Sequence, residues 1–464
     1  MKINRNIILA LLTFLIVIVC VPIVNARSII PTILISSSKD NLNDARELLN
    51  KGKQLYDAEN FATAAQVWEQ AVHNYSLEKE KRRGALAYRY LAIVYQDLGE
   101  WEAASNAISQ SLKLAETIND RFLYAQILNT QASYQLNTGN TQAALETWKQ
   151  AESIYKSLKD TQGVILTQIN QAQALQNLGF YRRSRNILEQ VNQNIHTLDN
   201  LSLKAKGLLS LGVALEVVGD LQKSQIVLYE SLQIAEDINL TQIGEIYLKL
   251  GNTAKAREDF KQAEKYYQQA IKNSQSSFLK LQAQINQLSL LIKTEQTQKA
   301  LTLVPEIKNL LAKRPPSRAK VYAQVNFVNN LIKIESKVRN ISDRQLAKIL
   351  ATSISEAKQL KDLKAQSYAL GELGHLYEQN KQLSEALQLT NKALNIAQNL
   401  QATETIPILR WQQARILKAQ GEKNQAINAY SQAIKGIESL RRDLVAVNSE
   451  NSDMQFSFRK RVEP

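Results

Sequence analysis

The segment YQDLGEWEAASNAISQS, Tyr95–Ser111, recurs along the chain at a fixed interval. Its Gly99 has counterparts at Gly139, Gly179 and Gly219, each forty residues after the one before. Each glycine separates two amphipathic stretches, and glycine takes the left-handed conformation that ends a helix at little cost. The interval therefore predicts a repeated helix-turn-helix unit.

Small residues recur at three positions of this unit, where two antiparallel helices need room to cross closely. The first position lies before each turn and holds Gly52, Ala92, Ala132, Ala172, Gly212, Gly251, Gly374 and Ala414. The second lies after the turn and holds Ala64, Ala104, Ala144, Ser184, Ser224, Ala263, Ala300, Ala386 and Ala426. The third holds Ala71, Ser111, Ala151, Ser231, Ala270, Ala393 and Ala433. Large residues share one offset on the second helix and are expected to fill the space between the helices: Trp68, Ile108, Trp148, Leu188, Leu228, Tyr267, Val304 and Tyr430.

This pattern resembles the tetratricopeptide repeat, which has small residues at its eighth, twentieth and twenty-seventh positions. The resemblance covers about residues 44–439. It implies an all-α fold, a right-handed α-solenoid of about ten helix pairs with a concave groove. The period near 40 residues exceeds the usual period of about 34, which implies longer second helices or loops.

The resemblance also divides the chain. Repeats 1–7 are expected at 44–317, a divergent, stretched repeat at 318–361 and repeats 9–10 at 362–440. In the stretched repeat, Ala347 is predicted to take the small position after the turn. Leu288 occupies a position that is normally small, so a bend or looser packing is expected in this region. Asp120, Asp160, Asn200 and Asp362 are predicted to cap helices.

The N-terminus is predicted to be an export signal. Lys2 and Arg5 precede an apolar run, and the small residues up to Ala26 suit a cleavage site, so residues 1–26 read as a signal peptide. The run is nearly long enough to span a bilayer, which requires about 20 residues, so an uncleaved signal anchor is the alternative. An extracytoplasmic location is expected, with membrane attachment only through this segment. Residues 27–43 read as a polar linker.

Charge and composition argue against several function classes. The formal net charge is +14, and loss of residues 1–26 would leave +12. Basic and acidic residues are interleaved, which favours a solvated surface over a nucleic-acid site. Cys20 is the only cysteine, so cleavage would leave neither a disulfide nor a catalytic thiol.

The sequence predicts no enzyme, metal site or cofactor. His73, His196 and His375 are the only histidines and lie more than a hundred residues apart, which does not suit a zinc site. The glycines mark turns and form no phosphate-binding loop. Trp68, Trp101 and Trp148 fall on packing positions and are interpreted as core residues.

The remaining function class is binding, and the family pattern places side chains of the first helices on the inner face of the groove. Amide side chains there can donate to and accept from the backbone of an extended polypeptide, although Gln and Asn are common throughout this chain. The predicted peptide-binding residues are Arg89, Asp97, Gln126, Asn129, Ser133, Gln173, Gln176, Asn177, Tyr368, His375, Trp411 and Arg415.

The C-terminal part carries a more specific resemblance. LKAQSYALGELGHLYEQ at 363–379, and LRRDLVAVN at 440–448 followed by QFSFRKRVEP, resemble the repeat region of bacterial CHAT-domain proteins. In those proteins the repeats precede a caspase-like peptidase domain, whose His and Cys would lie downstream. Residues 441–464 resemble the interdomain junction and are expected to be poorly ordered and to leave the last repeat incompletely capped.

Two functions remain from these observations. The main hypothesis is an exported, non-catalytic scaffold that binds a polypeptide in its groove or docks a CHAT-type partner. The alternative is the regulatory or substrate-recognition half of a split or truncated CHAT peptidase. Nucleic-acid binding is a third hypothesis, disfavoured by the export signal and the scattered charge.

Overall fold

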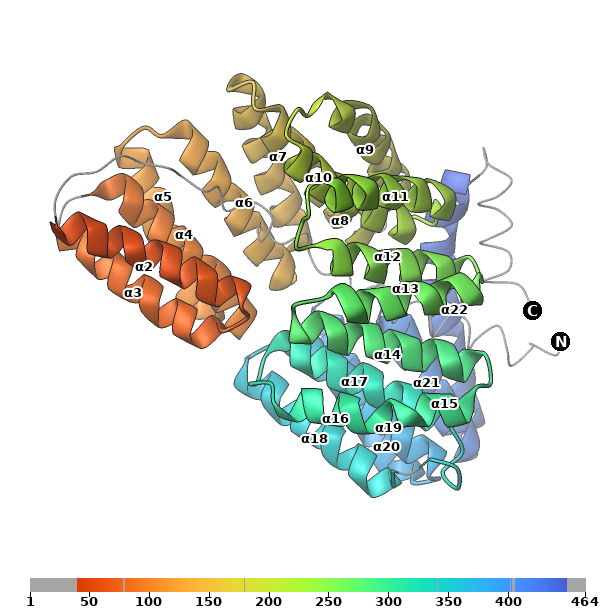
Figure 1. Cartoon of the computed structure of the whole chain (residues 1–464). Coiled ribbons are helices and arrows are strands. Elements are labelled where there is room, and N and C mark those ends of the chain that lie inside the picture. The colour runs from red at the N-terminus through yellow and green to blue at the C-terminus, as the bar shows by residue number, and fades with distance from the viewer. Residues whose placement is uncertain are drawn as a thin grey trace. The chain divides into compact units, whose positions relative to one another are not determined.

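The structure, a computed structural model, describes residues 40–77, 80–178, 180–339, 341–400, 402 and 405–448. The predictions for the signal peptide, for most of the linker, for Gly179 and for residues 449–464 lie outside the described residues. Every element of the described chain is helical, which confirms the all-α fold (Figure 1). No helix in these ranges is long and apolar enough to cross a membrane.

Within the described ranges the helices follow one another as ten pairs, the number that the sequence predicts. The pairs are α2 (Asp40–Asp57) with α3 (Phe61–Leu77), α4 (Lys81–Leu98) with α5 (Trp101–Thr117), α6 (Arg121–Asn137) with α7 (Thr141–Ser157), α8 (Thr161–Asn177) with α9 (Tyr181–Asn194), α10 (Leu201–Val217) with α11 (Leu221–Asp237), α12 (Ile243–Ala256) with α13 (Phe260–Asn273), α14 (Ser277–Lys293) with α15 (Thr297–Thr302) and α16 (Val304–Ala312), α17 (Arg318–Ile332) with α18 (Asp343–Gln359), α19 (Leu363–Gln379) with α20 (Leu383–Asn399), and α21 (Ile406–Ala419) with α22 (Lys423–Asn448). A short 3-10 helix, Ile195–Thr197, follows α9.

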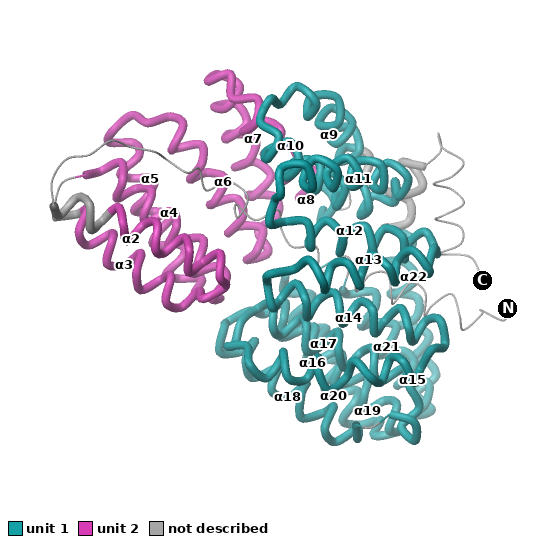
Figure 2. The backbone as a smooth tube through the Cα atoms, in the orientation of Figure 1, with its two compact units in different colours: residues 1–21, 175–464 teal, residues 22–174 magenta. Residues whose placement is uncertain are grey.

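The chain forms two compact units, whose described parts are residues 40–174 in unit 2 and residues 175–448 in unit 1 (Figure 2). Within each unit, the two helices of a pair pack together and the second helix packs on the first helix of the next pair. First helices also contact first helices: α4 contacts α6 in unit 2, and α10, α12, α14, α17, α19 and α21 contact one another in sequence in unit 1. We call this arrangement the first-helix layer.

The forty-residue period arises from two helices of equal length. In α6 and α7 each helix has 17 residues, and three residues separate each helix from the next. The second helix therefore does not carry the added length alone, because the first helix has the same number of residues and the connections are short. The turns use left-handed residues: Gly99 has φ 77° and Gly139 φ 94°, and Lys381 adopts φ 61° at an equivalent turn.

Helix starts are capped largely as predicted. The side chains of Asp120, Asn200 and Asp362 accept hydrogen bonds from the backbone N–H groups of Leu123, Leu203 and Ala365. These bonds satisfy donors that a helix start leaves without a partner. These caps fix where α6, α10 and α19 begin.

Small residues allow the two helices of a pair to approach closely. The indole ring of Trp68 lies directly over Gly52, and Tyr267 lies over Gly251 in the same relation. At the third small position, the hydroxyl of Ser111 donates to the carbonyl oxygen of Ala85 at 2.6 Å across the pair. Trp68 and Trp148 are fully buried, as predicted for core residues, whereas Trp101, predicted to be a core residue as well, is only partly buried.

The stretched repeat differs from its prediction. The fourth residue of α18, Leu346, is fully buried at the position that Ala386 and Ala426 take in later repeats, whereas Ala347 is only partly buried. The assignment of Ala347 was wrong by one residue. The longer connection before α18 shifted the register, and Arg339 anchors that connection by donating to the carbonyl oxygen of Leu331 at 3.1 Å.

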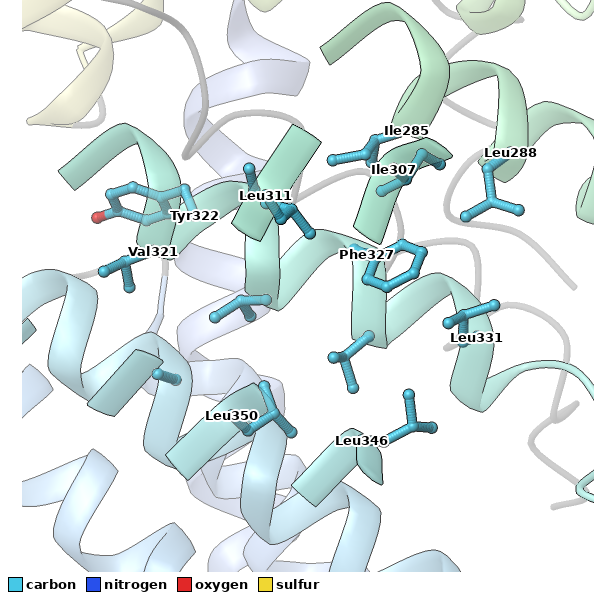
Figure 3. Close-up of a cluster of buried hydrophobic side chains, with 14 of the residues drawn as sticks. Ile285, Leu288, Ile307, Leu311, Val321, Tyr322, Phe327, Leu331, Leu346 and Leu350 are labelled. Atoms are coloured by element: carbon cyan, nitrogen blue, oxygen red, sulfur yellow. The ribbon is translucent and has the colours of Figure 1, made fainter. Parts of the chain in front are cut away.

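The core is not interrupted in this region. One hydrophobic cluster joins α14 to α19 and contains Leu288, Ile307, Phe327 and Leu346 (Figure 3). Leu288 is fully buried although its position is normally small. The second helix of this pair is divided into α15 and α16, with a proline at the start of α16. The expectation of looser packing is thus wrong, because larger apolar side chains fill the added space.

Gly251 occupies the small position that lies before the turn. The close approach of the helices at this position predicts the effect of adding one methyl group. In Gly251→Ala the new Cβ would lie 2.6 Å from two ring carbons of Tyr267. Tyr267 is fully buried and its hydroxyl donates to Asn252, so the ring has little freedom to move. We expect a loss of about 1–3 kcal/mol in the free energy of unfolding, measured by urea denaturation.

Gly84→Ala is the matched control within a helix. Its Cβ would meet no atom closer than 3.5 Å, so the better helix propensity of alanine should raise stability by about 0.5–1 kcal/mol. Equal effects of the two substitutions would show that the helices do not depend on this contact.

Candidate functional site

The predicted binding residues lie on the first-helix layer, because every one of them belongs to α4, α6, α8, α19 or α21. The packing positions of a first helix face its partner helix, so the remaining positions meet the neighbouring first helices or solvent. Within each unit, the hydrogen bonds show which of these side chains are used between helices and which remain accessible.

Arg89 of α4 is buried between first helices of unit 2, with 3% of its surface exposed. Its Nε donates to the carbonyl oxygen of Gln126 and to Oγ1 of Thr130, both at 3.2 Å on α6. Burial lowers the pKa of Arg89, and the nearby phenols of Tyr90 and Tyr155 only partly oppose this effect. Its Nη1 has no hydrogen-bond partner among the described residues. Arg89 therefore links α4 to α6 and is not exposed to a ligand.

The polar residues of α6 are also engaged within unit 2. Asn129 is half-buried and donates through Nδ2 to the hydroxyls of Tyr155 and Thr167 at 3.4 and 3.5 Å. Ser133 donates to the carbonyl oxygen of Asn129 at 3.0 Å. The side chain of Gln126 is buried. Asn129 therefore connects α6 with α7 and α8, whereas the hydrogen bond of Ser133 stays within α6.

Two further hydrogen bonds join neighbouring first helices of unit 2 near their C-terminal ends. The hydroxyl of Tyr56 donates to Oδ2 of Asp97 at 2.6 Å, and Nδ2 of Asn137 donates to Oε1 of Gln96 at 3.1 Å. Each pair is 41 residues apart, one repeat plus one residue. The predicted binding residue Asp97 thus accepts a hydrogen bond from the preceding first helix.

The three predicted residues of α8 differ in exposure. Gln176 is buried and donates to Oγ of Ser184 at 3.0 Å and to the carbonyl oxygen of Ala214 at 3.3 Å. Gln173 is half-buried, and its Oε1 has no partner among the described residues. Asn177 is exposed. Of the three, Asn177 is the most accessible to a ligand.

In unit 1 the structure brings His375 and Arg415 together around a residue that the sequence did not single out. Arg415 donates through Nε and Nη2 to the two carboxylate oxygens of Glu378, both at 2.7 Å. Nδ1 of His375 lies 3.3 Å from Oε2 of the same carboxylate. Burial alone would raise the pKa of Glu378, but the hydrogen bonds from Arg415 and His375 outweigh it and lower the pKa to about 2.

Tyr368 and Trp411 complete the predicted set. The hydroxyl of Tyr368 donates to Oδ1 of Asn326 at 2.9 Å, and its ring lies 5.6 Å from that of Tyr322. Trp411 packs edge-on against Tyr430 with ring centroids 4.9 Å apart, within its own helix pair. Tyr368 thus connects α17 and α19, while Trp411 belongs to the packing of α21 on α22.

Sequence reasoning missed Glu378 and Asn326. A usable signal was present for Glu378, which lies 37 residues before Arg415, the same interval that separates Arg89 from its acceptor Gln126. Among the described residues, no group of His, Cys, Asp and Glu could hold a metal ion. The arrangement offers hydrogen bonds and charges on a fixed layer, which suits recognition of a polar ligand.

The comparison with protein families agrees with the fold. The family model of the tetratricopeptide repeat matches residues 239–269 and 367–400. These segments include most of α12 and α13 and of α19 and α20. Tetratricopeptide repeats are thus present in the chain, and together with the helix pairs they define an α-solenoid. None of the curated proteins compared with the chain matches it.

Several solved structures are similar to this chain. A Rap protein complexed with competence and sporulation factor has 15% identity and a TM-score of 0.48, with 77% of this chain and 99% of that chain covered. The Rap conjugation gene regulator of plasmid pLS20, in complex with the Phr* peptide, has 14% identity and a TM-score of 0.45, covering 88% and 98%. Yeast Tom70 has 13% identity and a TM-score of 0.37, covering 92% and 100%.

The Glu378 cluster predicts a pH-dependent contribution to stability. The pKa of Glu378 is depressed below its ordinary value of 4.5, so its stabilising effect is fully present above that value and is lost as the pH falls toward 2. We expect Arg415→Ala to lower the free energy of unfolding by about 1–3 kcal/mol at pH 7, and by clearly less at pH 3. Chemical denaturation at both pH values measures this difference.

Lys418→Ala is a suitable control on the same helix, because Lys418 is exposed. It should change stability little at either pH. A loss for Arg415→Ala that is the same at pH 3 and pH 7 would contradict the role assigned to Glu378.

Proposed function

We propose that this chain is a non-catalytic protein-interaction scaffold whose first-helix layer binds a polypeptide. The observation that carries the proposal is the row of polar side chains on consecutive first helices of unit 1, from Asn326 through Tyr368 and His375 to Arg415. Hydrogen bonds between the helices hold this row in place, so little conformational entropy is lost when a ligand binds.

The spacing of the layer suits an extended chain. Packed helices lie about 8–10 Å apart, and an extended polypeptide rises about 3.3 Å per residue. About three residues of a bound strand would therefore pass each first helix. Side chains that both donate and accept can pair with either polarity of a peptide backbone.

Export is part of the proposal. The apolar segment preceded by Lys2 and Arg5 supports an extracytoplasmic location, with anchoring through an uncleaved segment as the alternative. The chain would then meet its polypeptide ligand outside the cytoplasm.

Photocrosslinking tests the binding face. Benzoylphenylalanine placed at Asn177 or Lys418, both exposed on first helices, should capture polypeptides from the native extract. The same group at Gln268 or Lys308, exposed on second helices, should capture far less. Mass spectrometry of the crosslinked products measures the difference. Equal capture at all four positions, or none, would reject the first-helix layer as the binding face.

An exposed surface on the last helix favours a second candidate function. Ile427 and Ile434 of α22 lie two turns apart on one side of the helix and are 66% and 37% exposed. A partner packing there would continue the stack, which is what a CHAT-type domain would do in the resemblance described above. In this alternative the chain is the regulatory or substrate-recognition half of a split peptidase.

The neighbouring coding sequence tests this alternative. If the chain serves a split peptidase, translation of the DNA after Pro464 in all frames should give a chain with the His and Cys of a CHAT domain. An unrelated gene at that place would leave the exposed isoleucines without this explanation.

A further inference from the structure

The last helix of unit 1, α22, has an apolar face that no following repeat covers. Elsewhere in this unit a second helix packs on the next first helix, as α18 does on α19 and α20 on α21. In the described chain no first helix follows α22, which contacts α21 and α9. Ile427 and Ile434 remain exposed beside these contacts. The position that a further first helix would take is therefore open.

The preceding repeat shows what covers the equivalent face. The residues forty positions before the two isoleucines are Leu387 and Leu394 of α20. Leu394 is 2% exposed and shares a hydrophobic cluster with Ile406 and Leu409, at the start of α21. Leu387 shares another cluster with Leu417, near the end of α21. In this repeat, apolar side chains of the next first helix thus pack with both positions.

The two clusters also define the direction of the covering helix. The start of α21 packs near the end of α20, and the end of α21 packs near the start of α20, so the two helices are antiparallel. In the same register, a helix on α22 would place two apolar residues, three positions apart, at Ile434. A third apolar residue, eight positions later, would lie at Ile427. Residues with this spacing share one face of a helix.

The other end of the solenoid is built differently. α2 is the first helix of the described chain, and its exposed Glu47 stands where α21 has Leu409. In the next repeat, Ala87 takes this position and is fully buried in a cluster with Tyr75 of α3. A second copy joined end to end would place the carboxylate of Glu47 against Ile434, and burial of an unpaired charge is costly. The two ends are therefore not complementary.

The exposed isoleucines depart from what a terminal repeat requires. The last repeats of a solenoid usually carry a polar outer face, which keeps the protein soluble. Glu47 follows this rule at the N-terminal end, whereas Ile427 and Ile434 do not follow it at the other end. Exposed apolar residues that lie together on one face mark an interaction site.

We propose that the face of α22 formed by Ile427 and Ile434 binds an amphipathic helix of a partner protein. This helix takes the place of the next first helix and runs antiparallel to α22. The inference goes beyond the first-helix layer. It rests on the premise of the second candidate function that this face is covered, and it names the element that a partner of any kind must supply.

A peptide with the sequence of α21, residues 405–420, is the probe, because α21 covers the equivalent face of α20. Its affinity for the full chain is measured by fluorescence anisotropy with an attached fluorescein. The double variant Ile427→Asp, Ile434→Asp should bind at least about tenfold more weakly, equivalent to about 1.4 kcal/mol. Burial of an isoleucine side chain contributes at least this much. Isolated peptides of this length are only partly helical, so relative affinities are compared.

Ile226→Asp is the matched control, because Ile226 is 58% exposed on α11, a second helix that the next first helix already follows. It should leave the affinity within about twofold, and circular dichroism confirms that the variants fold. A peptide with Leu409→Asp and Leu417→Asp should not bind. Equal weakening by Ile226→Asp, no weakening by the double variant, or no binding of the original peptide would overturn the proposal.

Photocrosslinking tests the direction of the bound helix. Benzoylphenylalanine in the peptide at the position of Ile406 should attach near Ile434, and at the position of Leu417 it should attach near Ile427. Tandem mass spectrometry maps the attachment sites. The reverse pattern would reject the antiparallel register.

Sedimentation velocity tests whether a second copy occupies the face. The full chain should remain monomeric as its concentration is raised, because Glu47 stands at the opposite end. A dimer that the double variant Ile427→Asp, Ile434→Asp abolishes would make a second copy the occupant and overturn the proposal.

The outcomes separate this inference from the proposed function. Peptide binding that does not depend on the isoleucines, together with selective capture at Asn177 or Lys418, would reject the α22 site and leave the first-helix layer standing. Isoleucine-dependent peptide binding, together with equal capture on first and second helices, would support the α22 site and reject the first-helix layer as the binding face.

Discussion

The architecture depends on the close approach of the two helices in each pair. A glycine or alanine at the eighth position lies under a large side chain of the second helix, as Gly52 under Trp68 and Gly251 under Tyr267. In these two pairs a larger residue would meet that side chain and separate the backbones, which would change the angle at which the helices cross. Because the first helices of successive pairs pack side by side, that angle also fixes the register of the first-helix layer. The spacing of the polar side chains on the first-helix layer therefore depends on this apolar contact.

The first-helix layer contains a second set of constraints, which are polar. Hydrogen bonds between side chains about one repeat apart join Tyr56 to Asp97 and Arg415 to Glu378. Arg89 is the costly member of this set, because its buried guanidinium donates to one hydroxyl and one carbonyl oxygen and to no carboxylate in the described part of unit 2. A buried charge without a counter-charge carries a desolvation cost, which such hydrogen bonds offset only in part. Its contribution in this chain is to define how α4 and α6 align.

The fold could be predicted from the sequence because small residues recur at fixed intervals, and these positions show where two helices approach closely. It failed at Ala347, because an added connection shifted the register and Leu346 took the packing position in a wider space. The binding residues were harder to predict, since helical position alone does not tell whether a glutamine faces solvent or a neighbouring helix.

The distinction between satisfied and unsatisfied groups indicates where binding energy can come from. A side chain such as Gln176 or Arg415 already makes hydrogen bonds within the protein, so a ligand that recruits it exchanges one bond for another with little net gain. In this layer such side chains therefore set the geometry of the proposed binding face more than they supply its affinity.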